Sequence, residues 1–294
     1  VKAYRAEVRQ VVDRLISELP LNGPIDWESP WWIILMGIEH ERIHLETSSV
    51  LIRQHALKYV QPSANWAICA EQQSPAPLNS LVNIQARDVK IGKQDATYGW
   101  DNEYGAFEKH CSAFKSAKYL TSNAEFLGFV EAGGYANDDY WAEEGLSWKK
   151  YANATHPTFW IQQGADWKLR VMSEEIAMPW SWPAEVNYHE AKAFCHWKSE
   201  QLGVTVRMPT EAEWYSLYAA AGLSDEAVSK GNQANLYLDH FASSCPVNKF
   251  AHGELFDVVG NVWQWTETPI FPFDGFKVHP IYDDFTTPTY DGRH

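Results

Sequence analysis

Cysteine is scarce in this sequence, and its placement suggests neither a disulfide framework nor a zinc knuckle. The 294 residues include four cysteines, which lie far apart and form no CxxC pair. Scattered cysteines without a secretion signal are typical of reducing compartments, so we expect buried, reduced thiols in a cytoplasmic protein. The four are Cys69, Cys111, Cys195 and Cys245.

Long apolar runs and excess positive charge are also missing. The longest strongly apolar stretch, residues 31–38, is far shorter than the roughly 20 residues that cross a bilayer as a helix. There are 24 Lys and Arg against 38 Asp and Glu, which gives a formal net charge of −14. This balance argues against nucleic acid or an anionic membrane surface as a partner. The apolar content of 45% is that of a soluble globular protein.

Helical patterns are present at the start of the chain. Apolar residues recur at helical spacing from Tyr4 to Leu19 and predict an amphipathic helix. Ser29 and Pro30 form a suitable N-cap and first-turn pair for a longer helix that we expect to reach about Leu57. The chain begins with Val rather than Met, and we expect it to be a piece of a longer polypeptide.

The second helix carries the first candidate site, in the stretch "GIEHERIHLETS" at residues 37–48. His40 and His44 lie one turn apart, a spacing that lets two imidazoles share a metal ion, although two packed or solvated histidines remain the alternative. Both histidines lie on one stripe of this helix, which should face other helices, so at least one bundle helix is expected upstream of this chain. The spacing does not distinguish zinc, iron, copper or nickel. The same stripe carries Ile33, Met36, Thr47 and Leu51.

Nearby carboxylates are candidate outer partners rather than metal ligands. Glu39 and Glu41 flank His40, and Glu46 follows His44 by two residues. That step turns the helix by about 200°, so Glu46 should face away from a metal held by the histidines. The third ligand is therefore expected from another helix.

Beyond the two helices the sequence changes character. Residues 58–90 are mixed and contain Pro, Ser and Asn, as expected of a linker, and the remainder is rich in aromatic residues and Gly. Capping boxes predict three further helices, each ended by glycine. The boxes are Ser122 with Glu125, Asn187 with Glu190, and Thr210 with Glu213, and the helices end at Gly133-Gly134, Gly203 and Gly222.

The last residues form a second candidate site. The stretch "HPIYDDFTTPTYDGRH" has Pro280 and Pro288, so we expect a loop rather than a helix. Tyr282 and the polar residues around it could line an active site, and an ordered surface loop is the alternative. The sequence shows no Ser-His-Asp order and no phosphate-binding glycine loop.

Longer motifs carry a resemblance to a known family. "SNAEFLGFVEAGGYANDDYWAEEG", "EVNYHEAKAFCHWKSEQLGVTVRMPTEAEW" and "LFDVVGNVWQWTET" resemble the formylglycine-generating-enzyme, or sulfatase-modifying-factor, fold. "GIEHERIHLETSSVLIRQ" resembles the metal-binding helix of a DinB-like bundle. Together they resemble the nonheme iron sulfoxide synthases of thiohistidine biosynthesis. "YGWDNEYG", "GYANDDYWAEEGLSWKKY" and "IYDDFTTPTYDGRH" look like the ovothiol type, 5-histidylcysteine sulfoxide synthase, and the ergothioneine type is the alternative.

This resemblance implies an α+β protein in three parts. Residues 1–60 would be the C-terminal part of a DinB-like bundle, and 61–87 a linker. Residues 88–294 would be a loop-rich formylglycine-generating-enzyme-like (C-type-lectin-like) domain, incomplete at its C-terminus. A methyltransferase domain would follow in the full-length protein.

The resemblance also implies site residues. His40 and His44 match two of three iron-binding histidines, with the third expected upstream, and Tyr282 matches the active-site tyrosine, the proposed proton donor. Ile43 stands where the ergothioneine type often has Gln near the substrate, and Phe285 where it has a second tyrosine. Fe(II) would be the cofactor, oxygen the co-substrate, and histidine and cysteine the substrates.

Three further expectations concern a calcium site, formylglycine generation and functions of another class. A structural calcium site near "GNVWQW" should be weak or lost, because Gln264 replaces a carboxylate. Formylglycine generation needs a late pair of reactive cysteines, and no cysteine follows Cys245. A metal-dependent thiol transferase or a non-catalytic binding module are alternatives of another class.

Overall fold

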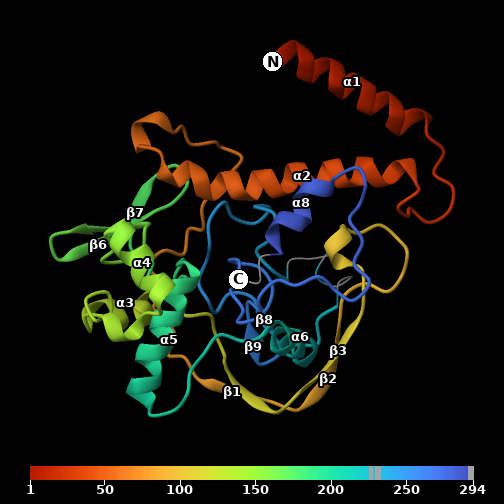
Figure 1. Ribbon diagram of the computed structural model, residues 1–294. Coiled ribbons are helices and arrows are strands. Elements are labelled where there is room, and N and C mark those ends of the chain that lie inside the picture. The colour runs from red at the N-terminus through yellow and green to blue at the C-terminus, as the bar shows by residue number, and fades with distance from the viewer. Residues whose placement is uncertain (225–227, 229–232, 291–294) are drawn as a thin grey trace. The chain divides into compact units, whose positions relative to one another are not determined.

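The computed structural model describes residues 1–224, 228 and 233–290, and leaves the side chains of 284 and 285 undescribed. It is a mixed helix and sheet structure (Figure 1). Its chain groups into two compact units that do not follow sequence order. Unit 1 comprises Val1–Thr47, Lys90–Glu108 and Ile270–Arg293; unit 2 comprises Ser48–Val89 and Lys109–Pro269.

The two predicted N-terminal helices are present. Helix α1 spans Lys2–Glu18 and has no buried residue. Helix α2 spans Pro30–Leu51, and the Ser29 hydroxyl accepts the Trp31 N–H at 3.3 Å, as expected of an N-cap.

Helix α2 ends earlier than predicted. Short 3-10 turns follow it at Ile52–Gln54 and Leu57–Tyr59. Between them the chain is extended at His55, and the preceding Arg53 side chain is buried and donates to the Arg170 carbonyl at 2.8 Å. This long-range contact holds the chain where the helix pattern would otherwise have continued.

The predicted stripe of α2 is buried only in part. Of its members, Met36 is buried, Ile33, His40 and Thr47 are half-buried, and His44 and Leu51 are exposed. Trp32 and Ile34, which lie outside the stripe, are the other buried residues of α2. The expectation that the stripe faces a further helix outside this chain stays a prediction. Apolar burial stops after two turns.

The strands β2 (Arg87–Ile91) and β3 (Phe107–Cys111) pair in a two-stranded sheet, whose residues are divided between the two units. In unit 1, the 3-10 turn η3 covers Asp101–Glu103 between these strands. In the last segment a short helix α8, Asp283–Thr286, precedes the 3-10 turn Thr287–Thr289. The expectation of a loop here was wrong for these turns, because Pro280 and Pro288 flank the helix rather than interrupt it.

Unit 2 holds most of the sheet and helix. β1 (Leu81–Ile84) pairs antiparallel with β4 (Phe114–Ala117). β5 (Trp160–Gln163), β6 (Asp166–Arg170) and β7 (Glu175–Ala177) form an antiparallel sheet. β8 (Ala251–His252) pairs with β9 (Leu255–Phe256). The helices are α3 (Asn123–Glu131), α4 (Glu143–Ala152), α5 (Tyr188–Leu202) and α6 (Glu211–Ala220), with a 3-10 turn η4 at Asp138–Tyr140.

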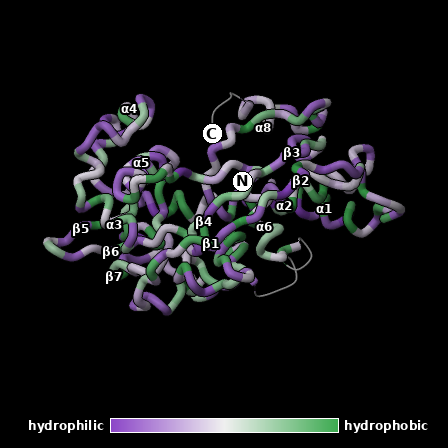
Figure 2. Tube along the Cα trace, turned by 90° about the horizontal axis from the view of Figure 1, so that it is seen from below, coloured by the Kyte–Doolittle hydropathy of each residue, from purple (hydrophilic) through white to green (hydrophobic). Residues whose placement is uncertain are grey.

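Aromatic side chains fill the core of unit 2. Phe126 and Phe194 stack at 5.3 Å between ring centroids, and Phe129 and Trp160 pack against the same cluster. Figure 2 shows how hydrophobic and hydrophilic residues alternate along the chain. The aromatic residues of this cluster therefore form the hydrophobic core of unit 2.

The predicted helix caps are largely confirmed. The boxes Asn187 with Glu190 and Thr210 with Glu213 are reciprocal. Ser122 accepts from the Glu125 N–H, but the Glu125 side chain instead accepts from Asn79 and pairs with Lys198.

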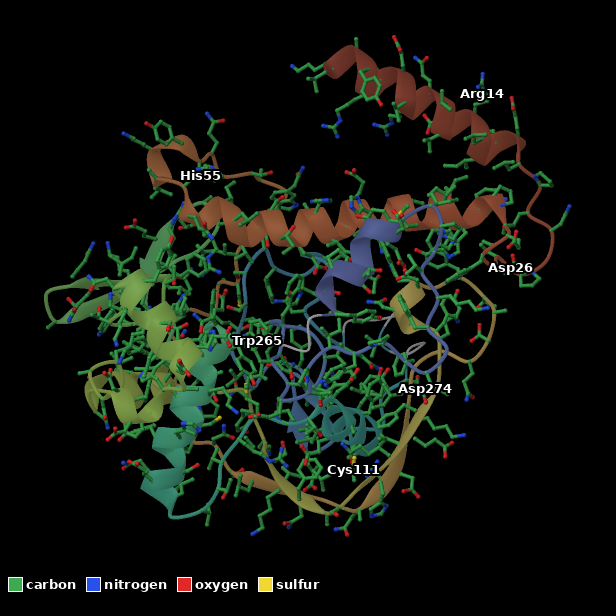
Figure 3. All side chains as sticks on the ribbon, in the orientation of Figure 1. Arg14, Asp26, His55, Cys111, Trp265 and Asp274 are labelled. Atoms are coloured by element: carbon green, nitrogen blue, oxygen red, sulfur yellow. The ribbon has the colours of Figure 1, made fainter. Side chains whose placement is uncertain are left out.

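The four cysteines are free and buried, as expected; Cys111 is labelled in Figure 3. No helix in the described residues combines the length and apolar character of a membrane span.

Candidate active site

Helix α2 brings His40 and His44 side by side. Their ring centroids lie 4.5 Å apart with an interplanar angle of 75°. His40 is half-buried and His44 is exposed. Two imidazoles this close on consecutive turns can share one metal ion.

The chemistry of this pair fits a transition metal in part. Imidazole is a ligand for iron, zinc, copper and nickel. Among the described residues, however, no three His, Cys, Asp or Glu side chains form a group that could hold a metal. A complete site would therefore need a donor in addition to these two.

The last segment brings Tyr282 to the same place. Its hydroxyl lies 3.1 Å from His40 Nε2, and the two rings are nearly perpendicular, with centroids 5.7 Å apart. Tyr282 immediately precedes α8. The three residues singled out in the sequence are thus adjacent, although 242 positions separate His40 from Tyr282.

Glu39 binds two aromatic residues of the 98–100 loop. One of its carboxylate oxygens accepts from Trp100 Nε1 at 2.7 Å and from the Tyr98 hydroxyl at 3.0 Å. The Trp100 ring in turn lies 6.0 Å from the Tyr282 ring. Burial, followed by the charge of Glu39, raises the pKa of Tyr98, so this phenol stays protonated and donates.

A buried polar cluster lies beside this site. Asp101 accepts from the His279 N–H at 3.2 Å and from the Thr286 hydroxyl. The His279 ring stacks on Trp32 at 3.6 Å between centroids, nearly parallel. Burial lowers the pKa of His279, which keeps its imidazole neutral.

Sequence reasoning missed this cluster and the role of the 98–100 loop. Asp101 and Trp100 lie in "YGWDNEYG", a stretch used only for family resemblance. Their partners are about 60 to 185 positions away. Local patterns such as caps and periodicity carry no signal for contacts of this range.

The remaining predicted positions are placed less directly. Ile43 is half-buried on α2, one residue before His44. The side chain of Phe285 lies outside the described residues.

Two side chains of the "GNVWQW" motif in unit 2 donate hydrogen bonds to Asp257, which precedes the motif. Gln264 donates its amide to the Asp257 carbonyl at 2.7 Å, and Asn261 donates to the Asp257 carboxylate at 3.0 Å. Burial raises the pKa of Asp257 to about 7. Gln264 here acts as a donor, and a weak or lost calcium site stays a prediction.

The cysteines of unit 2 are not activated as nucleophiles. Burial raises the pKa of Cys195 to about 11 and also raises that of Cys245. A thiol with a raised pKa is a poor nucleophile at neutral pH. The described thiols therefore offer no thiolate for chemistry of their own.

Comparison with known proteins adds three findings. Residues 69–277 match the profile of the sulfatase-modifying factor enzyme 1-like domain. The chain is 27% identical to hercynine oxygenase of Mycolicibacterium thermoresistibile over 99% of its own length and 64% of that protein. It is 26% identical to hercynine oxygenase of Mycobacterium tuberculosis over its whole length and 68% of that protein.

A second group of relatives covers less of the chain. Formylglycine-generating enzyme of Bos taurus is 28% identical over 73% of this chain and 63% of that protein. The chain thus spans about two-thirds of the length of the curated relatives it matches.

Proposed function

This chain belongs to the family of sulfatase-modifying factor enzyme 1-like domains, and we propose that it is an oxygen-dependent iron enzyme that couples a thiol to the imidazole ring of a histidine derivative. The observation that carries the proposal is the meeting of His40, His44 and Tyr282. The relatives named hercynine oxygenase and formylglycine-generating enzyme support an oxidative enzyme.

His40 and His44 would hold the iron in this proposal, with a further donor from outside the described pair. Fe(II), when bound, would supply oxygen chemistry and lower the pKa of a cysteine thiol. The Tyr282 hydroxyl lies at His40 Nε2 and can deliver a proton from its own oxygen. Glu39 accepts from Trp100 Nε1, and the Trp100 ring lies 6.0 Å from the Tyr282 ring, so Trp100 is a second aromatic neighbour of this tyrosine.

The relatives favour hercynine, the trimethylated histidine, as the imidazole substrate. Hercynine oxygenases align with nearly the entire chain, so the ergothioneine-type reaction is the first candidate. The second candidate is the ovothiol-type reaction, in which cysteine and unmodified histidine give 5-histidylcysteine sulfoxide. Ile43 favours it, because a half-buried apolar side chain beside His44 replaces the glutamine often found in the ergothioneine type.

A substrate competition tests both candidates. The chain, and a version extended at both ends to include the expected third ligand, would be given Fe(II), oxygen, cysteine and equal amounts of hercynine and histidine. Oxygen uptake and mass spectrometry of the sulfoxide products would show which imidazole is coupled. Absence of a carbon–sulfur adduct with either imidazole would overturn the proposal.

Assays with different metals distinguish the proposed enzyme from a thiol transferase and from a binding module. A thiol transferase would work with zinc or nickel and would not consume oxygen, whereas a binding module would take up neither metal nor oxygen. His44→Ala is the matched variant for these assays, because it removes one imidazole from an exposed position while leaving the core of α2 intact.

A further inference from the structure

We propose that Asp101 is a positioning residue that fixes Tyr282 by binding the chain on both sides of it. His279 lies three residues before Tyr282, and Thr286 four residues after it. Asp101 Oδ2 accepts the His279 backbone N–H at 3.2 Å, and Asp101 Oδ1 accepts the Thr286 hydroxyl. One carboxylate thus closes a loop that has the tyrosine between its two anchors.

All three residues that form these two hydrogen bonds are buried. The exposed fractions are 3% for Asp101, 2% for His279 and 1% for Thr286. A buried carboxylate without hydrogen-bond partners is costly. Asp101 therefore needs both donors, and displacing either end of the loop would leave one of its oxygens without a partner in the described structure.

A second contact fixes the His279 end against α2. The His279 ring stacks on Trp32, with centroids 3.6 Å apart and planes 6° apart. Its Nδ1 accepts the Ile281 N–H at 3.3 Å, so the turn leading to Tyr282 is tied to the same ring. The Tyr282 N–H also bonds to the His279 carbonyl at 3.2 Å.

The segment from His279 to Tyr282 contacts α2 at two positions that lie about two turns apart. Trp32 and His40 are eight residues apart, roughly 12 Å along a helix axis. Trp32 receives His279 and His40 receives the Tyr282 hydroxyl. The segment therefore touches α2 at two points, and Asp101, the first residue of η3, holds it there.

The catalytic consequence rests on the proposed function, whereas the positioning itself does not. If Asp101 and Thr286 only stabilised the fold, their loss would loosen unit 1 as a whole. If they position Tyr282, their loss changes the surroundings of that one phenol while the fold remains. A measurement on the tyrosine itself separates these cases without requiring activity.

The test is chemical nitration of tyrosines by tetranitromethane, followed by peptide mass spectrometry of each site. Thr286→Val removes the hydroxyl that Asp101 accepts and keeps the side-chain shape. Thr286→Ser restores the hydroxyl. Thr287→Val is the matched control, because it makes the same change at the next, exposed residue. Tyr104, a half-buried tyrosine of unit 1 that donates to the Thr97 carbonyl at 2.5 Å and packs on Trp27, is the internal reference for loosening of unit 1.

We expect Tyr282 in Thr286→Val to be nitrated roughly tenfold faster than in the parent chain, as for the loss of one hydrogen bond to a charged group. Thr286→Ser and Thr287→Val should retain the parent rate, and the nitration rate of Tyr104 should be unchanged in all three variants. An unchanged rate for Tyr282, an equal effect of Thr286→Ser, or a parallel rise for Tyr104 would each overturn the proposal.

Activity gives a second, separable readout. In an active chain, Thr286→Val should lower kcat with little change in KM, because the tyrosine and not the substrate contacts has moved. A rise in KM with kcat unchanged would overturn the positioning role. If the parent chain forms no carbon–sulfur adduct, the proposed function fails while the nitration result still decides the role of Asp101.

Discussion

Tyr282 is the side chain on which the proposed chemistry depends most directly. Its hydroxyl is 3.1 Å from His40 Nε2, and Tyr282→Phe removes the hydroxyl while keeping the ring that packs near Trp100. Without that proton donor, we expect the product ratio to shift from the carbon–sulfur sulfoxide toward cysteine sulfinic acid, because plain cysteine dioxygenation competes. Mass spectrometry of both products measures the ratio.

The matched control for this substitution is Tyr140→Phe. Tyr140 donates its hydroxyl to the Glu200 carboxylate at 3.0 Å, and both residues belong to unit 2. Tyr140→Phe should leave the product ratio near that of the parent chain. An unchanged ratio in Tyr282→Phe would remove the proton-donor role.

Glu190 is a buried carboxyl that should make stability depend on pH. Burial raises its pKa to about 7, against hydrogen bonds from Tyr135 and the Asn187 N–H. Because the pKa is raised in the folded state, that state binds the proton more tightly than the unfolded chain does. The folded protein is therefore stabilised as pH falls through 7, and the gain levels off below the ordinary value of 4.5.

Glu190→Gln isolates this effect. An amide can accept from the Asn187 N–H and donate to the Tyr135 oxygen, and it does not titrate. Between pH 8 and pH 5 the free energy of unfolding of the parent chain should rise relative to the variant by about 2–3 kcal/mol. Urea titrations at both pH values measure it; a constant difference would mean that Glu190 does not titrate in this range.

Helices were the elements that the sequence predicted best, because their signals are local. A cap lies three residues from its partner, and both reciprocal boxes of unit 2 formed at the expected residues. The strands, which have two to five residues, were not predicted, since such short stretches show little alternation. The end of α2 was placed too late, because Arg53 binds Arg170, 117 positions away.

The N-cap of α5 allows a direct test of this local logic. The Asn187 side chain accepts the Glu190 N–H at 2.9 Å. Asn187→Ala leaves that N–H without its acceptor and should lower the free energy of unfolding by about 1 kcal/mol. Asn187→Ser keeps an acceptor and should recover most of the loss. Chemical denaturation measures both, and equal stability of the Ala and Ser variants would contradict the cap.

The candidate site shows what local signals cannot supply. The histidine pair was visible on α2, since one turn separates its members. Tyr282 was singled out by the polar, proline-bearing stretch around it and then by family resemblance. Its position against His40 depends on contacts between segments more than 200 residues apart. Asp101 and His279 had no local signal, because each acts through a partner 178 positions away. Residue types that can carry out chemistry are recognisable in the sequence. Their proximity in the site arises only when the chain folds.

Unit 1 as a whole should depend on its last segment. Its three stretches lie far apart in sequence, and His279 from the last covers Trp32, a buried residue of α2. Most of the stability of a helix in a protein comes from the packing of its apolar face rather than from its intrinsic propensity. A chain ending at Pro269 should therefore lose amide protection in α2 between residues 32 and 47, while α5 in unit 2 keeps its protection.

Hydrogen exchange with mass spectrometry resolves the two helices in one experiment. A chain ending at Tyr290 is the control, because it retains His279, Tyr282 and Thr286. It should exchange like the full chain in α2. If α2 stayed protected in the chain ending at Pro269, the stacking of His279 on Trp32 would not be what holds it. In that case the buried face of Trp32, Ile34 and Met36 would be stabilised by the 98–104 loop alone, where Trp32 donates to the Gly99 carbonyl at 3.1 Å.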